Sequence, residues 1–271
     1  MSLPDCENLT LSRDGSFLTV CFNRPAVKNA LSLAMVTELE SVLYAIEKDR
    51  SIRALILRGT GGHFCAGGDI KDMAKAKQAR PEPGGRDPVA ALNRRFGSVI
   101  SALNNTPQTV VAVVEGAAMG GGFGLVCVAD VVIVHQDAKL RLPETSLGLP
   151  PAQIAPFLVQ RLGLSKARRL ALTGSRMNGL QAHQEGLADI CCKDEAELEE
   201  ALAAICAQIR RCAPIASAQT KALLMSCGTE SLDDLLDRGA DLFSRAASSA
   251  EGMEGMMSFL QKRQPAWERQ G

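Results

Sequence analysis

The sequence predicts an α/β protein with a largely parallel sheet in its first half and helices in its second. Short apolar runs alternate with helix-like patterns up to residue 143, and this alternation is typical of strand–helix–strand units. From Glu144 onward, helix-like patterns dominate. The 271 residues suffice for one large domain or two small ones. We expect a core region over 1–200 and a helical region over 201–271.

The elements of the first half follow from local pattern. The expected strands are short apolar runs at 18–22, 52–57, 109–114 and 131–134. Ser32 can cap a helix that extends to about Lys48, with apolar residues three and four apart. Further helices are expected at 93–104 and, after a glycine-rich turn, within 120–128. The stretch 75–88 is rich in Pro, Gly and charge, and we expect little regular structure there.

The second half reads as helices at 194–211, 213–226, 230–247 and 250–262. Pro214, Gly228 and Gly252 separate them. Apolar residues recur at helical spacing in 230–247, a pattern that fits either a core or a subunit contact.

The composition argues against several functional classes of protein. Hydrophobic residues make up 46% and charged residues 22%, as in globular proteins, and the 30 basic residues balance the 30 acidic ones. A zero net charge and a single Trp disfavour nucleic-acid binding, including an RNA-binding scaffold role. No run is apolar enough to span a membrane and the first residues do not resemble a signal peptide, so we expect a cytoplasmic protein without a membrane partner.

The nine cysteines include no Cys-x-x-Cys pair. Most lie in apolar runs, so we expect buried thiols in a reducing compartment rather than disulfides, and we expect no metal site. His63 and His135 are expected to be structural or exposed.

Two glycine-rich segments, 61–70 and 114–124, each follow an expected strand. Glycine lets backbone N–H groups approach a ligand, and a helix N-terminus adds unpaired donors. Two such turns side by side could aim two N–H groups at one oxygen, as in an oxyanion hole. Tight packing alone is the other interpretation. Neither segment fits a dinucleotide or phosphate-loop pattern.

Together with their neighbours, these segments resemble the crotonase (enoyl-CoA hydratase/isomerase) superfamily over essentially the whole chain. The motifs are NRPAVKNAL at 23–31, FCAGGDIK at 64–71, GAAMGGG at 116–122, PETSLG at 143–148 and EGMMSFLQKR at 254–263. The resemblance implies a crotonase-like spiral of ββα turns with a C-terminal α-helical trimerisation region. It also implies a homotrimer or dimer of trimers, an acyl-CoA substrate, and no cofactor beyond the CoA that the substrate carries.

The resemblance places the oxyanion hole at the N–H groups of Gly68 and Gly121. Two-glutamate hydratases of the superfamily carry carboxylates at the positions of Gly124 and Glu144, so only Glu144 is present here. A lone carboxylate can support hydration of a 2-enoyl-CoA, which we prefer, or Δ3–Δ2 isomerisation. Decarboxylation and thioester hydrolysis use the same hole. The missing side chain at Gly124 is expected to open space for a branched acyl group.

Other residues match CoA-binding positions of the family. They are Ala66, Asp69, Ile70, Lys71, Lys28, Phe259 and Lys262. In some relatives the last two reach CoA from a neighbouring subunit. Plain surface lysines and a core phenylalanine are the alternatives.

The variant segments of this chain look like those of the isohexenylglutaconyl-CoA hydratases, which act on a branched, carboxylated enoyl-CoA. These segments are CAGGD at 65–69, GLPPAQIAPF at 148–157, the arginine pair at 168–169 and QPAW at 264–267. A substrate carboxylate would need a cation, and arginine is suited to this because its guanidinium fork matches a carboxylate. The hypothetical partners are Arg80, Arg86, Arg94 and Arg95, which simple solvation would also explain.

Overall fold

The structure, a computed structural model, describes residues 3–81 and 83–269. Its larger sheet has six strands in the order β1-β2-β3-β4-β6-β9. The first pair is antiparallel and the other pairs are parallel. The strands are β1 (Leu9–Asp14), β2 (Phe17–Phe22), β3 (Ala54–Gly59), β4 (Thr109–Val114), β6 (Val131–His135) and β9 (Ile190–Cys192). A smaller sheet contains β5 (Ala117–Met119), β7 (Lys139–Arg141) and β8 (Arg176–Asn178).

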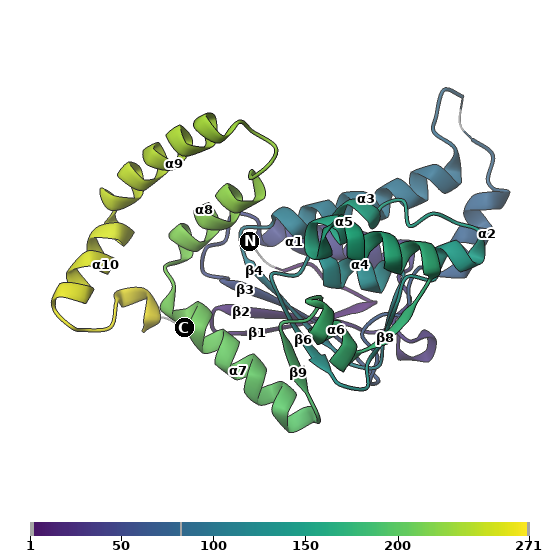
Figure 1. Cartoon of the computed structure of the whole chain (residues 1–271), viewed down its shortest axis with the longest axis horizontal. Coiled ribbons are helices and arrows are strands. Elements are labelled where there is room, and N and C mark those ends of the chain that lie inside the picture. Colours follow the sequence, from purple (N-terminus) through teal and green to yellow (C-terminus); the bar gives the residue numbers. More distant parts are fainter. Residues whose placement is uncertain (1–2, 82, 270–271) are drawn as a thin grey trace.

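Helices connect and cover these strands (Figure 1). In the first part they are α1 (Leu33–Ile46), α2 (Ile70–Gln78), α3 (Pro88–Asn105), α4 (Gly121–Cys127), α5 (Ala155–Thr173) and α6 (Gly179–Glu185). The later helices are α7 (Glu195–Arg211), α8 (Pro214–Met225), α9 (Leu232–Ala247) and α10 (Ala250–Leu260). Short 3-10 turns are η1 (Pro25–Val27), η2 (Glu144–Leu147) and η3 (Ala266–Glu268). The mixed architecture confirms the α/β prediction, and the cap of α1 is the Ser32 hydroxyl, which accepts from the Met35 N–H at 3.2 Å.

The central strands of the larger sheet are buried on both faces. Successive residues of β4 point to opposite sides, so Val110 and Ala112 join the main core with α1, α3 and α4, whereas Val111 and Val113 join a second cluster. Helix α7 covers that second cluster with Leu198 and the apolar residues that follow it. The expected boundary at residue 200 therefore falls inside α7, which packs with the sheet, and the helical arm begins at α8.

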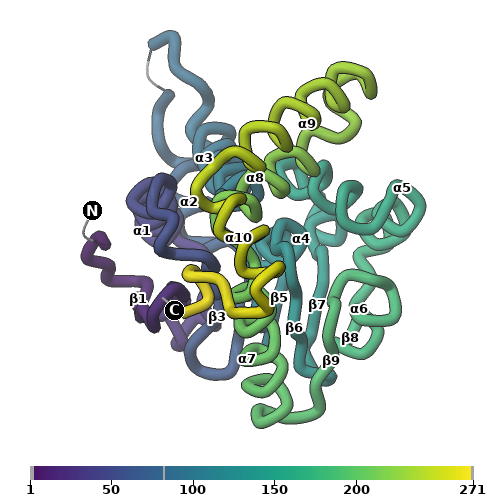
Figure 2. The backbone as a smooth tube through the Cα atoms, turned by 90° about the vertical axis from the view of Figure 1, so that its left-hand side faces the viewer, coloured from purple at the N-terminus to yellow at the C-terminus, as the bar shows by residue number. Residues whose placement is uncertain are grey.

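The arm, α8 to α10, extends from one end of the molecule, while α2 lies at the other end (Figure 1). Its base is tied to the body by Lys221, which pairs with Asp130 at 2.6 Å. The chain after α10 then returns to α7 (Figure 2), where the Trp267 indole donates to the Arg211 carbonyl at 3.1 Å. Arg53 of the body donates to the Trp267 carbonyl. The arm is thus held at both of its ends.

The cysteine expectation needs correction. All nine are free thiols, but only Cys65, Cys127 and Cys192 are buried, and Cys212 and Cys227 are exposed. Cys212 and Cys227 lie just before and just after α8, and Cys6, Cys21, Cys191 and Cys206 are only partly buried. Across the described residues, no helix combines the length and apolarity needed to cross a bilayer.

The stretch 75–88 is more ordered than expected. Helix α2 continues to Gln78 and α3 already begins at Pro88, capped by Asp87, whose carboxylate accepts from the Ala90 N–H at 2.9 Å. Residue 82 lies outside the described residues.

Candidate active site

The two glycine-rich turns lie side by side. The Cys65 N–H donates to the Ala117 carbonyl at 2.8 Å, and the Met119 N–H donates to the Cys65 carbonyl at 2.9 Å. A Cβ on Gly67 would lie 3.1 Å from the Met119 carbonyl oxygen and 3.9 Å from the Cα of Gly120. Glycine at 67 is therefore required both by this contact and by a φ of 105°. The structure brings Gly68 next to the start of α4.

Two backbone donors are available at this junction. Gly68 is exposed, with open space where a Cβ would stand, while Gly121 is the first residue of α4. Outside the regular helices and strands of the described chain, no backbone hydrogen bond uses the N–H of either residue. The first N–H groups of a helix have no intrahelical partner. Two donors at one junction can together bind a single oxygen.

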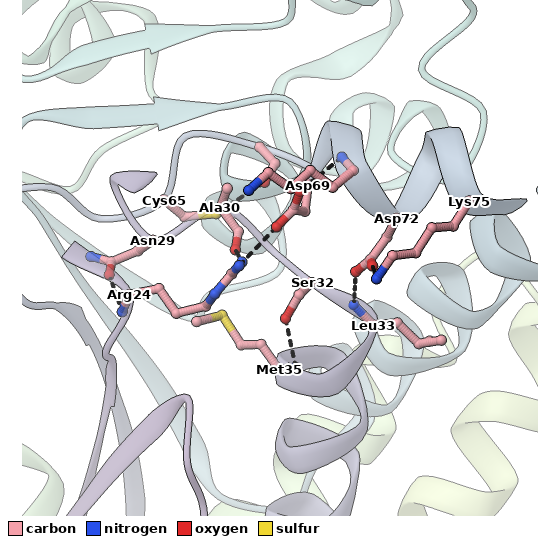
Figure 3. A network of polar contacts seen from close by, with 12 residues as sticks. Arg24, Asn29, Ala30, Ser32, Leu33, Met35, Cys65, Asp69, Asp72 and Lys75 are labelled. Carbon is pink, nitrogen blue, oxygen red and sulfur yellow. Dashed lines mark hydrogen bonds and ion pairs between the residues drawn. The ribbon is translucent and has the colours of Figure 1, made fainter. Parts of the chain in front are cut away.

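The Gly68 turn is held by the segment 24–31 (Figure 3). The Arg24 guanidinium pairs with the Asp69 carboxylate at 2.8 Å, and the Asp69 N–H donates to the Leu31 carbonyl at 2.9 Å. The other carboxylate oxygen of Asp69 accepts from the Lys71 N–H at 2.9 Å and so caps α2. Burial opposes the charged form of Asp69, but these bonds outweigh it and hold its pKa below the ordinary value. Both Asp69 oxygens are thus engaged within the chain.

Glu144 stands against the second turn. Its Oε1 would lie 3.0 Å from a Cβ built on Gly120, and its Oε2 is buried without a hydrogen-bond partner among the described residues. Burial raises the pKa of this carboxyl. A half-buried carboxylate with an unused oxygen beside two backbone donors can accept and return a proton.

Gly124 does not open the space expected from the sequence. The residue is buried, and a Cβ there would lie 2.9 Å from Cγ1 of Ile154 and 3.0 Å from Cδ1 of Ile100. The volume that a longer side chain would take is occupied by these two isoleucines. The glycine therefore provides close packing of α4 against α3 and the start of α5.

The expected CoA-binding residues divide into two groups. Lys28, Ala66, Asp69, Ile70 and Lys71 lie together, since the Ala66 N–H donates to the Lys28 carbonyl at 2.9 Å and 69–71 begin α2. Ile70 is 79% exposed, although it is apolar.

The second group lies far from this junction. Phe259 and Lys262 are in α10 and just after it, at the end of the molecule opposite α2 (Figure 1). Phe259 is 83% exposed, which excludes the interpretation as a core phenylalanine in this chain. One chain by itself does not bring these two residues to the glycine turns.

The arginines and histidines have identifiable surroundings. Arg95 pairs with Glu40 of α1, and Arg94 donates to Ser98 of its own helix at 2.9 Å, whereas Arg80 and Arg86 are exposed between α2 and α3. The Nδ1 of His63 accepts from the Ala117 N–H at 3.1 Å, which joins the two turns structurally. The described residues contain no group of three or more His, Cys, Asp or Glu arranged for a metal.

Sequence reasoning missed three neighbours of the site. A Cβ on Gly121 would lie 2.9 Å from Cδ1 of Leu31 and 3.5 Å from Cζ of Phe96, and Ile154 covers Gly124. Leu31 and Ile154 lie inside motifs noted above, but nothing in their local pattern points to the site. Phe96 has no sequence signal at all.

The chain belongs to the enoyl-CoA hydratase/isomerase family, whose sequence profile matches residues 12–270. It is 34% identical to a probable enoyl-CoA hydratase of Bacillus subtilis (strain 168), over 90% of this chain and 91% of that one. It is 31% identical to the 2,3-dehydroadipyl-CoA hydratase of Escherichia coli (strain K12), over 95% and 97%. The 1,2-epoxyphenylacetyl-CoA isomerase of the same organism is also 31% identical, over 92% and 93%.

Solved structures share the crotonase fold with this chain. An enoyl-CoA hydratase/isomerase from Marinobacter aquaeolei superimposes with a TM-score of 0.95 at 49% identity, covering 97% of this chain and 100% of that one. Pseudomonas aeruginosa AtuE superimposes with a TM-score of 0.93 at 52% identity and the same coverage. The expected crotonase-like fold with a helical C-terminal region is confirmed, and the protein is an enzyme of this family, which acts on acyl-CoA.

Proposed function

We propose that the protein is a hydratase that adds water to a 2-enoyl-CoA, with Glu144 as its single catalytic carboxylate. The observation that carries the proposal is the buried Oε2 of Glu144, which has no hydrogen-bond partner in the described part of the chain, while Oε1 lies against Gly120. A buried carboxylate oxygen without a partner is costly, and proteins retain such groups where a ligand or water completes them.

The N–H groups of Gly68 and Gly121 bind the thioester oxygen and stabilise the enolate. Removing a single donor of this kind typically costs about 3 kcal/mol. Glu144 takes a proton from water as the hydroxide adds to Cβ, and the alkene electron pair moves onto the thioester oxygen. The protonated Glu144 then returns the proton to Cα, so that one water has been added. The chemistry needs no cofactor beyond the CoA of the substrate.

The raised pKa of Glu144, caused by burial, suits this double role. A carboxyl group whose pKa is raised toward neutral pH is a stronger base when it is ionised, and it is more readily protonated so that it can then act as an acid.

The preferred substrate is a branched, carboxylated enoyl-CoA. The proposal is supported by the resemblance of segments 65–69 and 148–157 to isohexenylglutaconyl-CoA hydratases, and by a relative named as a 2,3-dehydroadipyl-CoA hydratase. Arg80 and Arg86 are exposed between α2 and α3 and can offer the cation. Unchanged KM for a dicarboxylic acyl-CoA in Arg80→Ala and Arg86→Ala variants would exclude them.

Isomerisation of a 3-enoyl-CoA is the second candidate. It is favoured by the same lone carboxylate, because moving a proton from Cα to Cγ needs one base and no water. A relative named as an isomerase is 31% identical to this chain.

Assembly into a homotrimer or a dimer of trimers would cover apolar side chains that the arm exposes in one chain. These side chains are Phe243 of α9 (78% exposed) and Leu260 (75%) and Phe259 of α10. In such an assembly we expect Phe259 and Lys262 to reach the CoA of a neighbouring subunit, and their distance from the site within one chain supports this arrangement. Sedimentation of the purified protein tests the assembly.

The reaction is tested with crotonyl-CoA, a 3-enoyl-CoA and a branched glutaconyl-CoA in heavy-oxygen water, with products read by mass spectrometry. The proposal expects heavy oxygen in the product of the wild-type enzyme and its loss in Glu144→Gln. Isomer formation without heavy oxygen would establish the second candidate instead. Absence of turnover on all three esters would contradict both.

A further inference from the structure

The backbone contact between the two glycine turns is irregular at His63. Two bonds of a parallel ladder join the turns, from the Cys65 N–H to the Ala117 carbonyl at 2.8 Å and from the Met119 N–H to the Cys65 carbonyl at 2.9 Å. In the regular continuation of such a ladder two residues earlier, the Ala117 N–H would donate to the His63 carbonyl. It donates instead to the Nδ1 atom of the His63 imidazole, at 3.1 Å. A side chain thus replaces a main-chain carbonyl in this ladder.

The His63 carbonyl is held by Asn29. This asparagine is fully buried, and its Nδ2 donates to the His63 carbonyl at 2.7 Å and to the Thr60 carbonyl at 2.9 Å. Its Oδ1 accepts from the Arg24 N–H at 2.8 Å. The carbonyl of His63 is therefore engaged by Asn29, and the imidazole takes its place opposite the Ala117 N–H.

Gly116 lets the imidazole approach the backbone closely. A Cβ at position 116 would lie 2.4 Å from the His63 Nδ1 and 2.1 Å from the Gly62 carbonyl oxygen, and the residue has a φ of 54°. Glycine is the residue that tolerates both conditions. The imidazole therefore lies directly against the backbone that leads into β5.

The bond to Ala117 requires the neutral form of His63. An imidazole nitrogen accepts a hydrogen bond only when it carries no proton, so Nδ1 accepts in the neutral ring and not in the imidazolium. Burial lowers the pKa of His63, and the charges of Lys28 and Lys139 lower it further. The surroundings thus favour the form that the ladder needs.

The charged groups around His63 come from several elements. Lys28 ends η1, Lys139 begins β7, and Glu115 lies between β4 and β5. The Glu115 carboxylate pairs with Arg58 of β3 at 3.2 Å. Two cations therefore act on the imidazole, while the nearby carboxylate is neutralised by Arg58.

The ladder leads directly to the two proposed donors. Gly67 lies so close to the second segment that a Cβ on it would be 3.9 Å from the Gly120 Cα. Gly68 and Gly121 are the next residues of the two segments. The relative position of their N–H groups thus depends on how the two segments are held together at the ladder.

We infer that His63 is a positioning residue for the oxyanion hole, because its neutral imidazole holds β5 in the register that aims the Gly68 and Gly121 N–H groups at one oxygen. Protonation of Nδ1 releases the Ala117 N–H, so the two donors lose their fixed spacing in acid. The inference rests on the proposed enolate chemistry at these donors, and it adds the residue that makes the hole sensitive to pH.

Two variants separate the hydrogen bond from the bulk of the side chain. The Oδ1 of an asparagine can accept from the Ala117 N–H and does not titrate, whereas leucine offers no acceptor. His63→Leu is expected to lower kcat for crotonyl-CoA at least tenfold at pH 8 with KM within threefold, as for an interaction that acts in the transition state. His63→Asn is expected to recover at least threefold of that loss. An unchanged kcat in His63→Leu, or an equal loss in both variants, would overturn the inference.

The pH profile gives a second readout. Protonation of Glu144 lowers kcat in every variant, so its effect cancels in the ratio of wild-type kcat to His63→Asn kcat. This ratio is expected to fall at least threefold from pH 8 to pH 4.5, because only the wild type loses its acceptor at residue 63. A ratio that does not change with pH would overturn the inference.

His135 provides the matched control for this profile. Its Nδ1 also accepts a backbone N–H, from Asp137 at 3.2 Å, but at the end of β6. The ratio of wild-type kcat to His135→Asn kcat is expected to stay within twofold over the same pH range. A fall as large as that for His63→Asn would show that the effect does not belong to His63.

Amide exchange separates this inference from the proposed function. Exchange of the Ala117 amide proton with heavy water needs no substrate and is read by mass spectrometry of peptides that span 115–121. His63→Leu is expected to raise the exchange rate at least tenfold at pH 7, and His63→Asn less than threefold. If the wild-type enzyme converts no enoyl-CoA, the proposed hydration fails, and this comparison alone decides on His63. Equal exchange rates in the wild type and His63→Leu would overturn the inference.

Discussion

Arg24 and Asp69 form an ion pair at 2.8 Å that joins the segment before η1 to the first turn of α2. The pair is partly shielded, with 10% of the Asp69 side chain exposed. Arg24 also donates to the Ala30 carbonyl, so one guanidinium bonds both to Asp69, the residue after Gly68, and to the segment whose Leu31 backbone pairs with Gly67 and Asp69. An oxyanion donor works only when it is held in place before the charge develops. Arg24 and Asp69 thus serve as positioning residues.

Breaking this pair should slow the reaction more than it weakens binding. Arg24→Ala and Asp69→Asn are expected to lower kcat by about tenfold to a hundredfold, that is, about 1.4 to 2.7 kcal/mol. Arg24→Lys should recover part of the loss because the charge remains. Asp72→Asn is the control, since Asp72 also links α2 to α1, through the Leu33 N–H at 2.7 Å, without touching the Gly68 turn. A rise in KM with unchanged kcat in these variants would contradict the positioning role.

Gly120→Ala should disable the enzyme through Glu144. Gly120 has a φ of 50° and its Cβ would lie 3.0 Å from the Glu144 Oε1. The backbone at Gly120, with a φ of 50° and a ψ of −116°, lies in a region that side chains rarely adopt and costs an alanine about 1–3 kcal/mol. Gly62→Ala is the matched control, because it has a φ of 71° but no atom within 4 Å of its Cβ position. We expect similar losses of Tm and at least a tenfold lower kcat only in Gly120→Ala. Equal kcat values in the two variants would be the contrary result.

The pH dependence of stability should report the burial of Glu144. Burial raises its pKa in the folded state, so the folded protein binds this proton more tightly than the unfolded chain does. The associated stability is present below the ordinary pKa of 4.5 and is lost as pH rises through the raised value. Glu144→Gln should therefore have a higher Tm than the wild type at pH 8, and the difference should shrink toward pH 4. A constant difference across that range would contradict the assignment.

The C-terminal tail should detach in acid before the sheet unfolds. The hydrogen bonds from Arg263 lower the pKa of Glu254 to about 2, and the Ala266 N–H also donates to this carboxylate. Stability from the pair is present above the unfolded value of 4.5 and is lost as pH falls toward 2. Trp267 is the only tryptophan, so its emission reports the tail directly.

We expect a red shift of that emission below pH 4.5, and a red shift already at pH 7 in Glu254→Gln. Glu230→Gln is the control, since Glu230 pairs with Arg238 at 3.2 Å within the arm and does not contact the tail. A red shift of equal size in both variants at pH 7 would show that Glu254 does not hold the tail.

Long, strongly patterned elements could be predicted from the sequence. The strand at 109–114 matches β4 because five of its six residues are buried and apolar, and the Ser32 cap fixes where α1 begins. Strands β5, β7 and β8 have three residues each, too few for a periodic signal. The hairpin strand β1 was missed because most of its residues are not buried, and so its pattern is weak.

The candidate site could be predicted only in part. Gly68, Gly121 and Glu144 follow from motifs, because glycine and carboxylate are required there by chemistry. Ile154 was missed because its contact with Gly124 depends on a turn that Gln153 anchors on α3, which no local pattern records. The prediction of open space beside Gly124 was wrong for the same reason, since the two isoleucines that fill this volume are distant from Gly124 in sequence.

The most direct measurement of the central claim is exchange of the Cα proton of butanoyl-CoA with heavy water, followed by NMR. This saturated ester adds no water, so exchange requires only the enolate at Gly68 and Gly121 and a base at Cα. The account predicts exchange in the wild-type enzyme and at least a 100-fold slower rate in Glu144→Gln, with the Kd for the ester within threefold. Exchange in Glu144→Gln at the wild-type rate would contradict it.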